Sequence, residues 1–520
     1  MHRILSVFIA LIFFSFTGNA QATRFAEGIT PARLRSHLEV LTSDSLAGRE
    51  TGTEGNLKAS DYIARHFESV KIPPVQKKSY FQDIVFTAEE FAEIKVRIDE
   101  KDYANNWDFY SFAAYNSDFQ TEESSVLFLG YGIDDPAYSD YRNRKVKGKI
   151  LLVFSGEPML NDSISWISKQ TKLSSWSTDV GIKAEAAKKH GARALLIIDG
   201  NLQKNLNAYR NSYLNGSLKM GDGLHHEEHF CNSIYISTTM AKAIIGNSYD
   251  KVVALRKKTS ENGKPGFVKL KTRIIITQKK KIRKLISRNV LGYIHGTDPK
   301  LSEELVVISA HMDHLGKKGD GIYRGADDDG SGTCAVMEIA RAFSEAKSKG
   351  EGPRRSVLCL LVTGEEKGLL GSEYYASHPI FPLENTVADV NIDMIGRVDE
   401  EHQKDENYVY VIGSDKLSTD LYHINENMNE VHTKLKLDYK YNDENDPNRY
   451  YYRSDHYNFA KRGIPVVFYF NGTHADYHRT TDTIEKINFE LLSKRARLAF
   501  FTAWEIANRE KRLVIDKKSK

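Results

Sequence analysis

The stretch that decides the fold runs from Leu305 to Gly332: LVVISAHMDHLG (305–316), a short loop, then GADDDGSG (325–332). Residues 305–310 form a nearly unbroken apolar run, typical of a strand buried on both faces of a parallel sheet. That strand would deliver His311 and Asp313 at its C-terminal end, on the same side of the extended chain. Three consecutive acids then reach a glycine turn that opens a helix, predicted over 333–346. Three adjacent carboxylates repel one another, and a divalent metal is the simplest compensation.

The second half of the chain repeats this arrangement. From Arg288 onward apolar runs alternate with helical patterns, which predicts a doubly wound α/β domain. In such sheets ligands gather beyond the carboxyl ends of the strands. Five strands are expected, over 289–294, 305–310, 357–363, 387–392 and 464–470. Polar residues follow the last three of them: Glu365 and Glu366, then Asp393, then His478.

Together with His311 and Asp328, these residues offer two imidazoles and several carboxylates but no thiolate. Such donors suit zinc in a catalytic site, and manganese or cobalt fits the same ligand types. Two imidazoles and three carboxylates, counting one of Glu365 and Glu366, make five ligands. One tetrahedral ion needs fewer, so we expect two ions about 3.5–4 Å apart that share a carboxylate. Glu365 and Glu366 point in different directions at a strand end. One can therefore bind metal while the other serves as general base toward a water.

Length and composition bound the class of protein. A chain of 520 residues exceeds one hydrophobic core, so two or more domains are expected. An apolar content of 41% and a charged content of 27% are typical of soluble globular proteins. The net charge of +4 is small for this length and gives no reason to expect a nucleic-acid partner.

The N-terminus carries the pattern of a targeting segment. A basic start, a short apolar core over 4–16 and small residues around Ala20 predict a signal peptide over 1–20. The apolar run is too short to span a bilayer, so we expect an exported protein, secreted or periplasmic, without a membrane anchor. Cys231, Cys334 and Cys359 are too few for a disulfide scaffold, and the last two are expected to be buried.

The region before the main sheet divides into two parts. Over 25–95 we expect the N-terminal part of the catalytic domain, with a helix pair between 30 and 72 interrupted by LAGRETGTEGN (46–56). Short strands around one helix predict an inserted small α/β domain over 96–280. The basic run 279–284 is expected to be a solvated linker into the catalytic domain, 281–515, and the His/Glu cluster 225–229 a solvated loop.

Several motifs, in one order along the chain, resemble those of the M28 family of di-zinc metallopeptidases. They are LAGRETGTEGN, AHMDHLG (310–316), GADDDGSG, TGEEKGLLGS (363–372), NIDMIGR (391–397), RSDHYNFAKRGIPVVFYFNG (453–472) and HRTTDT (478–483). The insert is similar to a protease-associated domain through VLFLGYGI (126–133), VKGKILLV (146–153), KAEAAKKHGARALLII (183–198) and IYIST (234–238). The whole set is most similar to secreted bacterial aminopeptidases.

The resemblance implies a mixed, mainly parallel sheet with helices on both faces. It also implies two zinc ions, with His311 and Asp393 on one, Glu366 and His478 on the other, and Asp328 bridging them. Glu365 would be the general base, and Asp313 would orient His311.

Other residues are candidates for substrate contact. Asp455 is expected to contact the substrate, with a helix N-cap as the alternative. Arg397 and Arg453 could bind a peptide carboxylate or pair with an acid of the site. The tyrosines 450–452 could form a rim over the pocket or pack on the surface. Second-shell or solvated positions are expected for His314, Asp327, Asp329 and His474.

The predicted function is that of an exported zinc aminopeptidase, which hydrolyses N-terminal residues from peptides with a di-metal-activated water. A carboxypeptidase or a one-zinc glutaminyl cyclase of the same fold is the enzymatic alternative. A binding protein that kept the fold and lost the chemistry is the non-enzymatic one. The preferred N-terminal residue, the native metal and the oligomeric state stay open.

Overall fold

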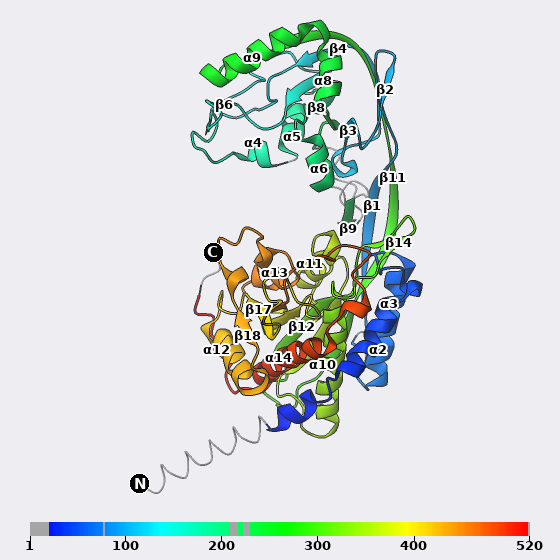
Figure 1. Cartoon of the computed structure of the whole chain (residues 1–520), viewed down its shortest axis with the longest axis vertical. Coiled ribbons are helices and arrows are strands. Elements are labelled where there is room, and N and C mark those ends of the chain that lie inside the picture. The colour runs from blue at the N-terminus through cyan, green and yellow to red at the C-terminus, as the bar shows by residue number, and fades with distance from the viewer. Residues whose placement is uncertain (1–19, 76–78, 180, 209–216, 222–228, 518–520) are drawn as a thin grey trace. The chain divides into compact units, whose positions relative to one another are not determined.

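The computed structural model of the chain describes residues 20–75, 79–179, 181–208, 217–221 and 229–517. The predicted signal peptide, except its last residue, and residues 225–228 of the His/Glu cluster lie outside these residues. The chain divides into two compact units (Figure 1). The first unit is Met1–Val85 with Leu285–Lys520, and the second is Phe86–Lys284. The predicted insert, 96–280, falls inside the second unit.

A mainly parallel sheet forms the centre of the first unit, in the order β18-β17-β19-β16-β12-β15-β11. Its four central strands are parallel: β19 (Val466–Phe470), β16 (Thr386–Ile392), β12 (Leu305–His311) and β15 (Ser356–Val362). At the edges, β17 (Tyr408–Ile412) is antiparallel to β19 and parallel to β18 (Lys436–Asp438), and β11 (Val268–Ile294) is antiparallel to β15. The mixed, mainly parallel sheet is therefore confirmed. The sequence analysis missed β17, a short apolar run after a long polar loop.

Helices cover both faces of this sheet because alternate strand residues point to opposite sides. Val306, Ile308 and Ala310 pack in one core and Leu305 and Val307 in the other. The first core is covered by α2 (Pro31–Leu41), α3 (Glu54–Ser69), α10 (Gly330–Ser348), α12 (Thr419–Met428) and α14 (Phe489–Asn508). The second is covered by α11 (Leu370–Ser377) and α13 (His456–Ala460). Figure 1 shows α10 and α14 side by side, and the two helices are in contact.

Shorter elements connect these layers in the first unit. They are η1 (Asp44–Leu46), β13 (Gly316–Lys318), β14 (Gly321–Tyr323), η4 (Glu365–Lys367), η5 (Leu383–Asn385), η6 (Asn429–Thr433), η7 (Lys440–Asn442), η8 (Tyr450–Tyr452) and η9 (Ile484–Lys486). The predicted helix pair is confirmed, and Thr30 caps α2 by accepting a hydrogen bond from Arg33 N. Cys334 and Cys359 are buried and unpaired, as predicted. Among the described residues, no helix combines the length and the apolarity that crossing a bilayer requires.

In the second unit the strand order continues as β11-β4-β5-β8-β10-β3. Its parallel strands β4 (Phe119–Phe128), β5 (Ile150–Phe154), β8 (Ala194–Ile198) and β10 (Ser233–Ile236) are followed at the edge by antiparallel β3 (Phe109–Tyr110). The helices are α4 (Ser175–Thr178), α5 (Ile182–Lys189), α6 (Leu202–Ala208), α8 (Thr238–Ile245) and α9 (Tyr249–Asn262). The small elements are β2 (Lys101–Tyr103), η2 (Ala113–Tyr115), β6 (Met159–Leu160), β7 (Ile164–Ser165), β9 (Ser217–Met220) and η3 (Gly246–Ser248). Apolar residues line both faces of the sheet.

The basic run 279–284 ends at the boundary between the two units, as predicted for a linker, but it is a regular strand and not an irregular solvated segment. It lies within β11, a strand of 27 residues that pairs with β1 (Phe81–Ile98). Acids of β1 compensate its charges: Glu93 binds Lys279 at 2.7 Å and Glu89 binds Lys280 at 3.1 Å. Opposite charges on neighbouring strands stabilise a sheet, so a like-charged run can be regular structure when its partner is acidic.

The glycine-rich loop 46–56 is fixed in the first unit by one buried cation. The guanidinium of Arg49 is fully enclosed and donates hydrogen bonds to four backbone carbonyls, those of Leu41, Met312, Arg324 and Gly325, at 2.6 to 2.9 Å. Met312 lies in the motif that carries His311, and Gly325 lies in the motif that carries Asp328. Arg49 therefore ties the loop to both segments.

Replacing this cation should destabilise the first unit. In Arg49→Met four buried carbonyls lose their donor, and we expect the free energy of unfolding to fall by about 3 kcal/mol or more. Urea denaturation measures the change. Arg65→Met, at an exposed position of α3, is the control and should stay within about 0.5 kcal/mol of the parent. Equal stabilities for the two variants would contradict the role of Arg49.

Candidate metal centre

Ends of neighbouring parallel strands bring the predicted ligands together. His311 is the last residue of β12, and Asp393 follows β16 directly. Glu365 and Glu366 begin η4, and two residues separate them from the end of β15. His478 lies in the loop after β19. Because these strands are neighbours with the same direction, their carboxyl ends meet at one edge of the sheet.

Asp328 lies between the two histidines. Its Oδ1 is 3.3 Å from Nε2 of His311, and its Oδ2 is 3.1 Å from Nε2 of His478. On the first side, Asp393 Oδ1 lies 3.6 Å from His311 Nε2. On the second side, Glu366 Oε2 lies 3.2 Å from His478 Nε2. Two sets of donors thus share a single carboxylate.

The spacing of these donor atoms fits metal binding. Zinc holds nitrogen and oxygen ligands at about 2.0–2.2 Å, so two ligand atoms on one tetrahedral ion are roughly 3.3 Å apart. The four distances above span 3.1 to 3.6 Å. Nε2 of His311 and Oδ2 of Asp328 are buried and have no hydrogen-bond partner among the described residues. The residues therefore fit zinc on both sides of Asp328.

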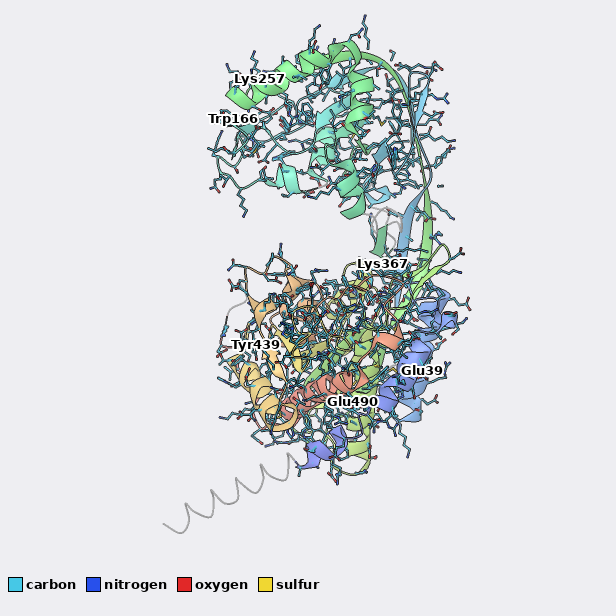
Figure 2. The ribbon with its side chains drawn as sticks, viewed as in Figure 1. Glu39, Trp166, Lys257, Lys367, Tyr439 and Glu490 are labelled. Atoms are coloured by element: carbon cyan, nitrogen blue, oxygen red, sulfur yellow. The ribbon has the colours of Figure 1, made fainter. Side chains whose placement is uncertain are left out.

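Glu365 and Glu366 occupy different surroundings. Glu366 Oε1 lies 2.7 Å from Nδ1 of His314, while its other oxygen faces His478. Glu365 Oε2 lies 3.9 Å from His311 Nε2, and this residue lines an open pocket. Lys367, which follows Glu366 and is labelled in Figure 2, forms an ion pair with Glu50 at 2.7 Å. Glu366 thus belongs to the donor set of His478, and Glu365 faces the space beside both sets.

The carboxylate of Asp313 points away from the imidazole of His311. Nδ1 of His311 lies 3.0 Å from the backbone carbonyl oxygen of Asp313 and 3.9 Å from its carboxylate. The carboxylate instead accepts hydrogen bonds from Thr51 Oγ1 at 2.7 Å and from Glu365 N at 3.2 Å. Asp313 thus holds the backbone of Glu365, and its carbonyl faces the outer nitrogen of His311.

His314, Asp327, Asp329 and His474 were expected either to support the metal ligands or to be solvated. Their side chains are all buried beside the centre, so the solvated alternative is wrong. His314 faces Glu366, and His474 Nε2 lies 3.3 Å from Asp327 Oδ2. Asp329 accepts hydrogen bonds from the backbone N–H groups of His311, Gly332 and Met394. Gly332 is required here, because a Cβ would lie 2.4 Å from Asp329 Oδ1 and from Ile392 O.

Asp482, in the HRTTDT motif, was missed by the sequence analysis. Its carboxylate accepts hydrogen bonds from the backbone N–H groups of Asp327 and Asp328, at 3.0 to 3.2 Å, and so fixes the loop that presents Asp328. Its place four residues after His478, in a motif already singled out, was the available signal.

Negative charge accumulates in this buried site. Burial raises the pKa of Glu365 well above its usual range, and the nearby carboxylates Asp393 and Glu366 raise it further, against His311. Burial alone would lower the pKa of His311, but Glu365 and Asp393 outweigh burial and raise it well above its usual value. Carboxylates packed this closely need a cation, which a divalent metal supplies.

The three predicted substrate contacts have different positions. Arg453 lines the open pocket, with its guanidinium over the ring of Tyr450. Arg397 is paired with acids, at 3.0 Å from Asp476 and 4.0 Å from Asp482. Asp455 is fully buried, makes no capping bond, and accepts a hydrogen bond from Ser372. Arg453 is therefore the one of the three that lies at the pocket.

The pocket beside the centre has a polar floor and apolar walls. The space within it is about 360 Å³, part of which is open to solvent. Its carboxylates are those of Asp328, Glu365 and Asp393, and its apolar lining comes from Met394, Tyr450, Phe468, Phe470 and Tyr477. Of the three tyrosines that were expected at a rim, Tyr450 lines this pocket.

Solved structures resemble the whole chain. An aminopeptidase from Aneurinibacillus sp. strain AM-1 aligns over 96% of this chain and 98% of its own, with a TM-score of 0.60 and 20% identity. BSAP, a zinc aminopeptidase from Bacillus subtilis, aligns over 93% and 97%, with a TM-score of 0.52 and 17% identity. At these identities the likeness shows the fold alone, which this chain shares with these aminopeptidases.

The sequence comparisons find one family model and several relatives. Residues 289–503 match the model of Peptidase family M28. A probable leucine aminopeptidase from Trichophyton verrucosum is 29% identical over 217 residues, 40% of this chain and 56% of the relative. Leucine aminopeptidase 1 from Sclerotinia sclerotiorum is 29% identical over 41% of this chain and 55% of its own length. The chain thus spans just over half the length of these relatives.

Zinc should stabilise the folded protein, because it binds a site that the unfolded chain lacks. At one hundred times its Kd, zinc should add about 2.7 kcal/mol and raise the Tm. Thermal denaturation of chelator-treated protein with and without added zinc measures the shift. Magnesium, which prefers all-oxygen sites, should give a smaller shift. The same Tm in chelator and in zinc would argue against the centre.

Proposed function

We propose that this protein is an exported zinc-dependent aminopeptidase that removes N-terminal residues from peptides. The observation that carries the proposal is the position of Glu365 at the open pocket, beside two donor sets that share Asp328. The match to Peptidase family M28 and the aminopeptidases among the relatives support a peptidase that acts at the N-terminus.

Two zinc ions would be held by the donor sets described above. His311 and Asp393 would serve one ion, Glu366 and His478 the other, and Asp328 both. The opposed oxygens of Asp328, each near one histidine, support this division. When bound, zinc supplies Lewis acidity, which makes water a stronger nucleophile near neutral pH and polarises the scissile carbonyl.

Glu365 is the residue placed to move the proton. Its carboxylate lines the pocket, and its backbone N–H is held by Asp313. A carboxylate in this position can act as the general base. It takes a proton from the attacking water and gives it to the amine nitrogen that leaves, so no covalent bond to the enzyme is needed.

The apolar walls of the pocket select the first side chain of the peptide. Met394, Phe468 and Phe470 offer no charged partner, so an apolar N-terminal residue fits best. The leucine aminopeptidases among the relatives agree with this preference. Arg453 at the same pocket can bind a backbone carbonyl of the peptide. Export is inferred from the signal peptide pattern alone.

The alternatives are less well supported. A glutaminyl cyclase binds one zinc, and His311 with Asp393 would then have no partner ion. A binding protein that had lost catalysis would have no need for a carboxylate, that of Glu365, outside both donor sets. A carboxypeptidase needs cations around the substrate carboxylate. Of the two candidate arginines, Arg397 is already paired with Asp476, and Arg453 alone lies at the pocket.

Matched substrates test the direction of cleavage. We expect leucyl peptides with a free amine to be hydrolysed and the same peptides with an acetylated amine to be left intact, because acetylation removes the ammonium charge. Release of a fluorogenic amide measures both rates. Equal rates for free and blocked peptides would exclude an aminopeptidase, and cleavage only at the C-terminus would favour a carboxypeptidase.

Two neighbouring glutamates test the assigned roles. Glu365→Gln should keep two zinc ions per chain by elemental analysis and lose about 10²- to 10⁴-fold in kcat, because it cannot take up the proton. Glu366→Ala should lose zinc instead. A Glu365→Gln variant with parental kcat, or a parent with well below two ions at saturating zinc, would contradict the proposal.

A further inference from the structure

A chain of buried polar side chains runs from the middle of the sheet to Asp393. Ser309 Oγ lies 2.7 Å from Asp389 Oδ1 and 2.9 Å from Asn391 Oδ1. Asn391 Nδ2 lies 2.8 Å from Ser454 Oγ. Ser454 Oγ lies 2.8 Å from Asp393 Oδ2. The five side chains thus make four consecutive contacts, all of hydrogen-bond length.

The four contacts require four protons, and the three middle residues supply only three. Each serine hydroxyl has one proton to donate. The amide of Asn391 donates to one neighbour through Nδ2 and accepts from the other through Oδ1, so it also supplies one. This count is the same if the amide is turned over. The fourth proton must therefore be on one of the two acids at the ends.

Of the two acids, Asp389 is the one that can carry the fourth proton. Asp393, beside His311 and proposed to bind metal, has to be ionised to be a ligand. Asp389 has no exposed surface, and its Oδ2 has no hydrogen-bond partner in the described parts of the chain. Burial raises the pKa of Asp389 well above its usual range and outweighs the lowering by the hydrogen bond with Ser309, while the carboxylate of Asp455 adds to the rise. The neutral form is the one that such surroundings favour.

We propose that Asp389 is a neutral carboxylic acid that starts a one-directional chain of hydrogen bonds ending on Asp393. Asp389 donates to Ser309, Ser309 to Asn391, Asn391 to Ser454, and Ser454 to Asp393 Oδ2. The second oxygen of Asp393, the one that faces His311, is left for the metal. Asp389 and Ser454 are positioning residues, and this role rests on the proposed function of Asp393 as a zinc ligand.

Infrared difference spectroscopy of the full chain tests the proton on Asp389 directly. Subtracting the spectrum of Asp389→Asn from that of the parent should show the loss of a protonated-carboxyl C=O band. Loss of a carboxylate band instead would overturn the proposal. The spectra are taken from zinc-loaded protein, in which Asp393 is ionised as a ligand, and they need no turnover, so the readout stands even if the protein proves not to be an aminopeptidase.

Zinc affinity, measured by competition with a chromogenic chelator, tests the positioning role. Ser454→Ala removes the donor to Asp393, and we expect zinc binding about tenfold weaker or more, the usual effect of losing an outer-shell partner. Asp389→Asn keeps a donor toward Ser309 and should bind zinc like the parent, whereas Asp389→Ala should bind it more weakly.

Ser377→Ala, at an exposed position of α11, is the matched control and should not change zinc affinity. Parental affinity in Ser454→Ala would overturn the positioning role. Equal weakening by Asp389→Asn and Asp389→Ala, with both variants folded by circular dichroism, would overturn the neutral donor. Failure of the centre itself would appear differently, as retention of zinc by Glu366→Ala.

Discussion

The carboxylate of Asp328, with one oxygen toward His311 and the other toward His478, is the constraint on which the first unit depends. Its two oxygens can serve two donor sets only if residues from several strands converge to within a few ångströms. A parallel sheet provides this convergence, because all its carboxyl ends lie at one edge. The burial of β12 between β15 and β16 is therefore what makes the shared position possible.

Burying so many carboxylates costs free energy, and hydrogen bonds from backbone N–H groups reduce that cost. Asp329, Asp327 and Asp482 each bind main-chain N–H groups or a histidine. Fixed N–H dipoles stabilise a carboxylate without adding a mobile cation that would compete with the metal. Arg49 contributes in another way, since its charge is taken up by four carbonyls and holds the loops in place. The remaining negative charge is thus left for the metal.

Long apolar runs made the central strands predictable to within two residues, and their ends located the ligand candidates. What the sequence could not provide is which atom of a side chain meets which partner. The carboxylate of Asp313 turns to Thr51, 262 positions away in the sequence, and away from His311. Ser454, which touches Asp393, stood beside the more conspicuous Asp455. The basic run was misread because its acidic partners lie on a strand far away in the sequence.

The two donor sets are not equivalent, although they share Asp328. The side chain of His311 is 1% exposed, and that of His478 is 28% exposed. Asp393, beside His311, is held by Ser454 and the chain behind it, whereas Glu366, beside His478, is faced by His314. A more enclosed and more strongly oriented set should hold its ion longer than one open to water. In the proposed two-zinc centre, the ion beside His311 would therefore be held longer than the ion beside His478.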